Sequence, residues 1–460
     1  MLERFDMSPL PRNMLTLHAR RSSSGTGPQG RISRGSSHVK CRLGITPRTG
    51  AKILIDLIRR ESMYGGPGGE TLSLPTRAAL GHCSTPCDIM RRMQTLFRVV
   101  AQTAFTIQLL ATVATAETII DGRRTVVVES PAATLLIDLG GGSIVDFHLS
   151  GGGLNPLHWL GPGDEHVILR PMAHFLCLDR WGPPSEAEQQ NGMQFHGEAS
   201  RVEWKERRAS EVRGAISAAM SAYLPIAGLE IQRSIRLADS AAVAVVSETV
   251  TNRNKLGRIY NMVQHATIGP PFLDETTLVD SNAGRGLMQS SPLPNPEQIE
   301  IRWPEATKDG NLVDLRRLTT DADPNVVSFV VDGDVGWVTA TNASKELLLG
   351  YIFSTADYPW LNLWRHVQGG RPLARGLEFG TTGLHQPFKI LTAKPQIFGK
   401  PTFAYLDSGE SVTRRFTAFL TKIPKDFSGV GSVTNRDGMI IVQERSGSQR
   451  EITINVGRLP

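Results

Sequence analysis

The sequence contains little cysteine, and the cysteines it has predict no metal or redox site. They occupy four of 460 positions, namely Cys41, Cys83, Cys87 and Cys177. No histidine or cysteine pair follows Cys83 and Cys87 to complete a zinc site. Cys177 lies in the apolar run 175–178, which is typical of a buried packing residue. We therefore expect neither a bound metal nor a cofactor.

The sequence also lacks a good membrane span. Residues 99–113 are apolar but too few, and too rich in Thr and Gln, for a comfortable transmembrane helix. A basic stretch beginning Met90-Arg91-Arg92 precedes them, and Ala114-Thr115-Ala116 follows. This order is typical of a secretory signal peptide. We predict a signal peptide over residues 90–116, cleavage after Ala116, and an exported protein, periplasmic or secreted; an internal amphipathic helix is the alternative.

Residues 1–89 lack a sustained apolar period and are rich in Arg, Ser and Gly. Such a composition cannot bury a core, so we expect a disordered leader. Because signal peptides act at the N-terminus, the alternative is that translation starts at Met90 or Met93. Cleavage after Ala116 would leave Cys177 as the single cysteine, which excludes an internal disulfide.

The excess of positive charge is confined to the N-terminal quarter. The whole chain has a net charge of +6 and a pI near 9.2, values that invite a nucleic-acid interpretation. Residues 1–116 contain 16 Lys/Arg against 6 Asp/Glu, whereas residues 117–460 contain 34 against 38. The main domain is therefore mildly acidic, and nucleic acid is not expected as its partner.

Long helical periods are scarce in residues 117–460, which instead contain many short β-type segments separated by Gly, Pro, Asn and Asp. Residues 229–237 show the alternation of a half-buried strand, with Leu229, Ile231, Ile235 and Leu237 on one side. The triple glycines at 140–142 and 151–153 match no dinucleotide fingerprint and predict hairpin turns. We predict strands over 125–129, 133–139, 144–149, 229–237, 241–251, 326–331, 336–341, 346–353, 412–420, 439–443 and 451–456.

This pattern predicts an all-β fold, because many strands without strand–helix alternation favour a large antiparallel sandwich. No internal repeat or low-complexity linker divides the region. We expect a single domain over residues 117–460.

Three polar residues stand beside glycine or proline, where strands end and side chains can converge on a cleft. They are His196 in Phe-His-Gly-Glu, His265 in Gln-His-Ala-Thr-Ile-Gly-Pro-Pro, and Glu378 in Gly-Leu-Glu-Phe-Gly. A carboxylate that takes a proton and an imidazole that gives one form a minimal general acid/base pair.

The order of these motifs resembles the aldose 1-epimerase (galactose mutarotase-like) superfamily. The resemblance covers roughly residues 123–456. It is carried by the hairpin 139–148 leading to Asn155-Pro156-Leu157, Arg180-Trp181-Gly182-Pro183-Pro184, His196-Gly197, the segment 247–254 ending in Asn, His265 with Gly269-Pro270-Pro271-Phe272, and Leu377-Glu378-Phe379-Gly380.

The resemblance implies a large antiparallel β-supersandwich that interconverts the anomers of a small-molecule sugar. It implies that Glu378 takes the proton of the anomeric hydroxyl and that His265 protonates the ring oxygen. His196 would bind a hydroxyl or help to polarise the ring oxygen.

Three further residues are candidates for substrate binding. Arg180 would hold a sugar hydroxyl or simply pair with Glu186 or Glu188. Trp181 and Trp364 would stack on a sugar face or belong to the core. A metal reading of His385 and of His196 with Glu198 lacks a third ligand at a suitable spacing.

The sequence departs from the family around its central residues. Gln-His-Ala-Thr stands here in place of Asn-His-(Pro/Ser)-Tyr, and Glu378 precedes Phe-Gly-Thr-Thr. These departures place the chain in a divergent branch, and they favour as an alternative a carbohydrate-binding protein without turnover. Another carbohydrate-active enzyme is a further alternative. A hydrolase would need a second acidic residue, for which Asp179, Asp274 and Glu275 are candidates, and a lyase would need a tyrosine or basic residue at the cleft.

Overall fold

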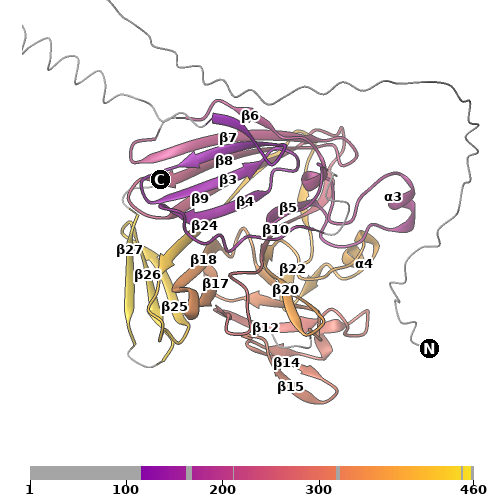
Figure 1. Ribbon diagram of the computed structural model, residues 1–460. Helices are drawn as coiled ribbons and strands as arrows, with labels where there is room; N and C mark the ends of the chain where they lie inside the picture. Colours follow the sequence, from indigo (N-terminus) through magenta and orange to yellow (C-terminus); the bar gives the residue numbers. More distant parts are fainter. Residues whose placement is uncertain (1–115, 162–167, 211, 318–321, 447–448, 457–460) are drawn as a thin grey trace, which may run out of the picture. The chain divides into compact units, whose positions relative to one another are not determined.

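The computed structural model describes residues 116–161, 168–210, 212–317, 322–446 and 449–456. Strands dominate this part of the chain, and they form two large sheets with three small ones beside them (Figure 1). The large sheets lie face to face, as is usual for two-layer β-proteins.

The first sheet has twelve strands in the order β1-β2-β3-β4-β5-β10-β20-β19-β16-β12-β13, with β23 paired to β10. Its strands are β1 (Ala116–Ile120), β2 (Arg123–Glu129), β3 (Ala133–Asp138), β4 (Ile144–Leu149), β5 (His174–Asp179), β10 (Arg258–Ile268), β12 (Ala283–Met288), β13 (Ile301–Arg302), β16 (Val326–Val331), β19 (Trp360–Gln368), β20 (Arg371–Gly380) and β23 (Ala404–Leu406).

The second sheet has eight strands in the order β11-β17-β18-β24-β9-β8-β7-β6. Its strands are β6 (Lys205–Arg207), β7 (Ala215–Leu224), β8 (Leu229–Ala238), β9 (Val243–Asn252), β11 (Leu278–Ser281), β17 (Val335–Asn342), β18 (Leu347–Ser354) and β24 (Ser411–Lys422).

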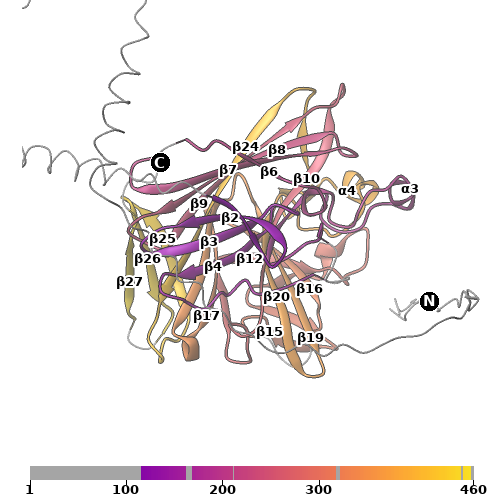
Figure 2. The ribbon, with the colours of Figure 1, turned by 45° about the horizontal axis from the view of Figure 1, so that its top comes forward.

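The smaller elements lie beside the two large sheets. A three-stranded sheet packs beside β11 and β17, and Figure 2 shows the helices α3 and α4 on one side of the molecule. These elements are β14 (Glu305–Lys308), β15 (Asn311–Asp314), β21 (Gln396–Ile397), β22 (Lys400–Pro401), β25 (Val430–Arg436), β26 (Met439–Glu444), β27 (Glu451–Asn455), α3 (Glu186–Gln190), α4 (Phe388–Ala393), and the 3-10 turns η2 (Ala199–Arg201), η3 (Pro296–Gln298) and η4 (Ala343–Lys345).

The core lies between the two large sheets. The four apolar residues predicted to share one side of 229–237 are all fully buried there. Phe379 of the first sheet stacks on Phe353 of the second, with ring centroids 4.5 Å apart. Because side chains alternate along a strand, the residues on either side of Phe379 in β20 point to the opposite face of the first sheet.

A buried polar chain crosses this core. Arg233 occupies an inward position of β8 and donates to Glu248 of β9 across 2.6 Å. The other carboxylate oxygen of Glu248 accepts from the side chain of Gln264 in β10 at 2.5 Å. Gln264 also donates to the hydroxyl of Tyr358 at 3.2 Å. Each charged group is thereby paired, as a charge removed from water requires.

The fold predicted from the sequence agrees with the structure. Each of the eleven predicted strands is present, within a few residues at its ends, and the triple glycines form hairpin turns around β4 with positive φ at Gly142, Gly151 and Gly152. Cys177 is fully buried, as predicted. The prediction missed the remaining strands, among them β5, β7, β10, β19 and β20.

The predicted leader 1–89 and the predicted signal peptide 90–116 lie outside the described residues, apart from Ala116 at the start of β1. Among the described residues, no helix is long and apolar enough to cross a membrane.

Candidate functional site

His265 and Glu378 face each other across two hydrogen-bonded strands. They are direct register partners in the antiparallel pair of β10 and β20. Both lie within their strands and not at strand ends, which corrects the expectation from the neighbouring glycines. The side chain of Glu378 points away from the core, because its neighbours Leu377 and Phe379 in β20 point into it. The side chain of His265, its register partner, lies on the same face of the sheet.

The two side chains are in direct contact. Nε2 of His265 lies 3.2 Å from Oε1 of Glu378. Nδ1 of His265 lies 2.9 Å from the hydroxyl of Thr267, which itself donates to the carbonyl of His265. The 3.5 Å contact of that hydroxyl with the carbonyl of His265 favours its accepting from Nδ1; in that tautomer Nδ1 carries the ring proton and Nε2 presents a lone pair to Glu378.

The other oxygen of Glu378 has its own partner. The indole Nε1 of Trp181 donates to Oε2 across 2.6 Å. A glycine makes room for the carboxyl group, because a Cβ at Gly376 would lie 2.6 Å from Oε1. The glycine of the Gly-Leu-Glu motif is therefore required for a local steric reason, because a side chain at Gly376 would collide with the carboxyl group of Glu378.

Burial sets the protonation states of the pair. It raises the pKa of Glu378 to about 8, against the opposing effect of the Trp181 hydrogen bond. It lowers the pKa of His265 to about 3. Near neutral pH one proton therefore lies between the two groups. Oε1 of Glu378 carries it and donates it to the Nε2 lone pair of His265.

His196 is held beside this pair by an unusual turn. Its φ is 66°, and its backbone N–H donates to the carbonyl of Gly182 at 3.1 Å. The N–H of Gly182 donates in return to Nδ1 of His196 at 3.1 Å. Nε2 must then carry the ring proton, since burial also lowers the pKa of this histidine well below its usual value. His196 is thus a fixed hydrogen-bond donor.

The glycine after His196 is required by its surroundings. Gly197 has a φ of 79°, and a Cβ there would lie 2.1 Å from the carbonyl oxygen of Leu178. The His-Gly motif therefore packs the turn directly against β5.

These residues line a pocket of about 250 Å³, which we call the central pocket. Aromatic rings make much of its wall, and the ring of Phe175 stacks on His265 at 4.2 Å. Few polar groups in a largely apolar concavity are typical of a small-molecule site. The lining residues are Trp159, Pro171, Phe175, Trp181, Phe195, His196, Arg201, His265, Asn325, Val326, Trp364, Glu378 and His385.

The structure brings five of the six sequence-predicted site residues to this pocket and leaves out Arg180. The buried Arg180 side chain donates to Asp179 at 2.7 Å and to Glu188 at 2.8 Å. It also lies over the ring of Phe388 in α4, 5.1 Å from the centroid. Arg180 therefore links α3 and α4 to β5 and does not line the central pocket.

Trp181 and Trp364 line the pocket in different ways. Trp181 is fully buried and is committed to Glu378 through its N–H. Trp364 is partly exposed and lies edge-on to Trp159, with centroids 5.7 Å apart. Trp364 is thus the better placed of the two to meet a ligand.

Sequence reasoning missed several lining residues. Trp159 and Phe175 reach the pocket through strand register and loop packing, which the sequence does not reveal. Arg201 follows His196 closely and could have been found from that spacing. Asn325 comes from the loop before β16 and gave no signal.

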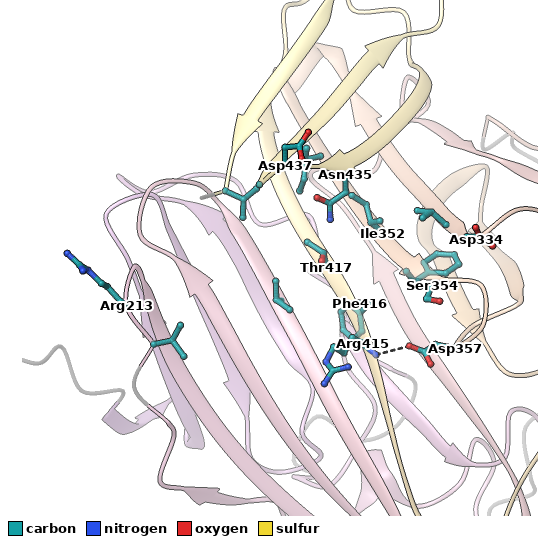
Figure 3. A pocket seen from close by; sticks show the side chains of 17 residues that line it. Arg213, Asp334, Ile352, Ser354, Asp357, Arg415, Phe416, Thr417, Asn435 and Asp437 are labelled. Atoms are coloured by element: carbon teal, nitrogen blue, oxygen red, sulfur yellow. Dashed lines mark hydrogen bonds between the residues drawn. The ribbon is translucent and has the colours of Figure 1, made fainter. Parts of the chain in front are cut away.

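The described residues support neither a metal site nor a functional site in a second, larger groove. Among the residues that the structure describes, no group of three or more His, Cys, Asp or Glu could hold a metal ion. A larger groove of about 1310 Å³ lies against β9, β18 and β24 (Figure 3). Its polar side chains, such as Arg213, Arg415 and Asp437, are exposed, unlike the buried carboxyl group and imidazoles of the central pocket.

Replacing Trp181 with Phe should raise the pKa of Glu378 further. A hydrogen bond to a charged group is worth about 1.5–3 kcal/mol, which corresponds to a rise of about 1 to 2 in pKa. The check is a ¹³C NMR titration of the Glu378 carboxyl carbon. Trp364→Phe is the matched control, since Trp364 lines the same pocket without bonding to the carboxyl; equal changes in both variants would contradict the assignment.

Comparison with known proteins supports the fold. No family model and no curated protein sequence matches the chain, but solved structures do. A galactose mutarotase-like protein from Clostridium acetobutylicum is 15% identical, with 67% of this chain and 98% of that chain covered and a TM-score of 0.51. A galactose mutarotase related enzyme from Lactobacillus acidophilus is 12% identical, with 65% and 98% covered and a TM-score of 0.47.

A galactose mutarotase-like protein from Lactobacillus casei is 13% identical, with 65% of this chain and 100% of that chain covered and a TM-score of 0.46. The match to the Clostridium acetobutylicum structure, with its TM-score of 0.51, shows that the chain has the galactose mutarotase-like fold, as its motif order predicted.

Proposed function

We propose that the protein interconverts the anomers of a sugar in the central pocket. The observation that carries the proposal is the contact between His265 and Glu378, which places one acidic proton and one basic lone pair side by side in a buried, aromatic-lined site. Anomer interconversion needs one proton donor and one acceptor, and it needs no cofactor.

The pair can supply both roles in succession. A proton shift from Glu378 to Nε2 of His265 gives a carboxylate, which the Trp181 N–H stabilises, and an imidazolium. The carboxylate takes the proton of the anomeric hydroxyl, and the imidazolium gives its Nε2 proton to the ring oxygen. The C1–O5 bond breaks, leaving an open-chain aldehyde and restoring the neutral pair. Rotation about the C1–C2 bond and the reverse transfers give the other anomer.

The remaining groups suit a single sugar ring. Nε2–H of His196 can donate to a sugar oxygen but cannot accept, which fixes its role as an orienting group. A volume of about 250 Å³ lies just below the roughly 300–1,000 Å³ usual for ligand pockets. We infer that the substrate is a monosaccharide and not an oligosaccharide.

Anomer exchange should depend on pH through the proton count of the pair. The rate should be flat from about pH 4 to 7 and should fall above pH 8, because Glu378 loses its proton near a pKa of about 8 and the pair then has no proton to give. A second fall should begin near pH 3, where His265 binds an extra proton. Polarimetry from pH 3 to 10, with the uncatalysed rate subtracted, checks this; a rate that keeps rising through pH 8 would contradict it.

A second function, sugar binding without turnover, is favoured by one observation. Both carboxyl oxygens of Glu378 already have partners within the protein. A ligand would have to displace His265 to reach Oε1. Binding that proceeds with no anomer exchange would select this alternative.

Glycoside hydrolysis receives no such support. Glu378 is the one acidic residue that lines the central pocket among the residues described. Asp179 is committed to Arg180 and Arg258, and neither Asp274 nor Glu275 lines the pocket. A hydrolase of the usual kind needs two carboxyl groups across the scissile bond.

We also propose, from the signal-peptide pattern at 90–116, that the protein acts outside the cytoplasm. N-terminal sequencing of protein made in its native host should give a mature chain that begins at Glu117. A mature start before residue 90 would contradict export by this signal.

A further inference from the structure

One cation lines the central pocket without a partner. Arg201 ends the turn η2, which follows the His196-Gly197 turn, and its side chain is partly buried. Its Nε is fully buried and has no hydrogen-bond partner in the structure. Nε of Arg375 is likewise unsatisfied, so what distinguishes Arg201 is its place on the wall of the central pocket.

Other buried arginines show what is missing at Arg201. Arg180 and Arg233 each donate to a carboxylate within 2.8 Å. No acidic side chain among the described residues forms an ion pair with Arg201, and burial, unopposed, lowers the pKa of its guanidinium. The guanidinium nevertheless remains charged at neutral pH.

Arg201 then determines the charge of the pocket. Burial keeps His196, His265 and His385 neutral near pH 7 by lowering each pKa, and it keeps Glu378 protonated. Of the described lining residues, Arg201 is the one that carries a charge in that range. Arg201 therefore has no carboxylate counter-ion among the described residues that line the pocket.

We infer that the pocket selects a monosaccharide with an anionic oxygen group, a carboxylate or a phosphate, which pairs with Arg201. A guanidinium matches either group with two parallel hydrogen bonds from its terminal amino groups. This inference rests on the same pocket as the proposed function and names its substrate class.

The depth of each group gives the orientation of the sugar. Glu378 is fully buried, whereas Arg201 is partly exposed and Phe195, another lining residue, is exposed. The anomeric carbon would lie at the base of the pocket and the anionic group toward its mouth. An anion at the end of the sugar remote from C1, as in a uronic acid or a 6-phosphate, fits this arrangement.

The test is calorimetric binding of matched sugars to the wild-type protein, which does not depend on turnover. The probes are glucose, glucuronate and glucose 6-phosphate, with the corresponding galactose series. At least one anionic sugar should bind about tenfold to a hundredfold more tightly than its neutral parent, and this advantage should shrink as salt is added. The carboxylate and phosphate arms show which anion is preferred.

Variants assign the effect to Arg201. Arg201→Gln should lower the affinity for the anionic sugar far more than the affinity for its neutral parent, and Arg201→Lys should keep part of the preference. Arg213→Gln, at an exposed arginine of the separate groove, should change nothing. If Arg201→Gln does not fold, the lysine variant and the salt dependence of the wild type still decide.

Two results would overturn the inference: equal affinity of the wild type for neutral and anionic sugars, or an equal loss of both in Arg201→Gln. Failure of the proposed function looks different. An anionic preference without any anomer exchange would remove the isomerase and keep the anion site. Exchange of neutral sugars without an anionic preference would keep the isomerase and remove the anion site.

Discussion

Replacing Glu378 with Gln should slow anomer exchange by about 10²–10⁴-fold, the usual contribution of a placed proton-transfer group. The amide nearly matches the neutral carboxylic acid in shape, and its oxygen can still accept from Trp181. It cannot take a proton from the anomeric hydroxyl. The loss should therefore appear in kcat, with the protein still folded and still able to bind sugar.

The matched control is Glu451→Gln, an exposed glutamate of β27 outside the pocket, which should retain wild-type exchange. His265→Gln should lose activity to a similar extent. Because the two residues act as one proton relay, the double variant should lose little more than either single variant. Losses that multiply in the double variant would show that the two side chains act independently.

The second large effect concerns stability. Glu248→Gln should lower the free energy of unfolding by about 3–5 kcal/mol, because it leaves Arg233 charged and unpaired in the core. Arg233 has no carboxylate other than Glu248 within ion-pair distance among the described residues, although it also donates to the carbonyl of Gly142 and lies over the ring of Trp204. Urea unfolding measures the effect.

The control is the double variant Arg233→Met with Glu248→Leu, which removes both charges. It should recover most of the lost stability, since an apolar pair of similar volume often replaces a buried ion pair without cost. A double variant as unstable as Glu248→Gln alone would place the effect in packing and not in the unpaired charge.

Much of the fold could be predicted because most strands alternate cleanly. The strand β8 shows this, with apolar residues at every inward position except Arg233. The four missed strands around the site carry polar residues at buried positions, such as His174, Gln264, Arg365 and Arg375. Those residues disguise the period of two, because their partners come from other strands and cannot be read from the local sequence.

In the site too, the sequence motifs could be recognised, but the register of the strands could not be predicted. The order of motifs was enough to identify His196, His265 and Glu378 as neighbours. The pairing of β10 with β20, which sets His265 opposite Glu378, required the structure. Arg180 and Trp181 are adjacent in sequence but point to different surroundings, so the sequence alone could not separate the structural residue from the pocket residue.

The central claim is that the His265–Glu378 pair opens and closes a sugar ring. Two-dimensional exchange NMR of neutral and anionic aldoses with the wild-type protein near pH 7 tests it most directly. The account predicts exchange cross-peaks between the H1 signals of the two anomers of at least one sugar, absent with Glu378→Gln. Binding of these sugars without any cross-peak above the uncatalysed level would contradict it.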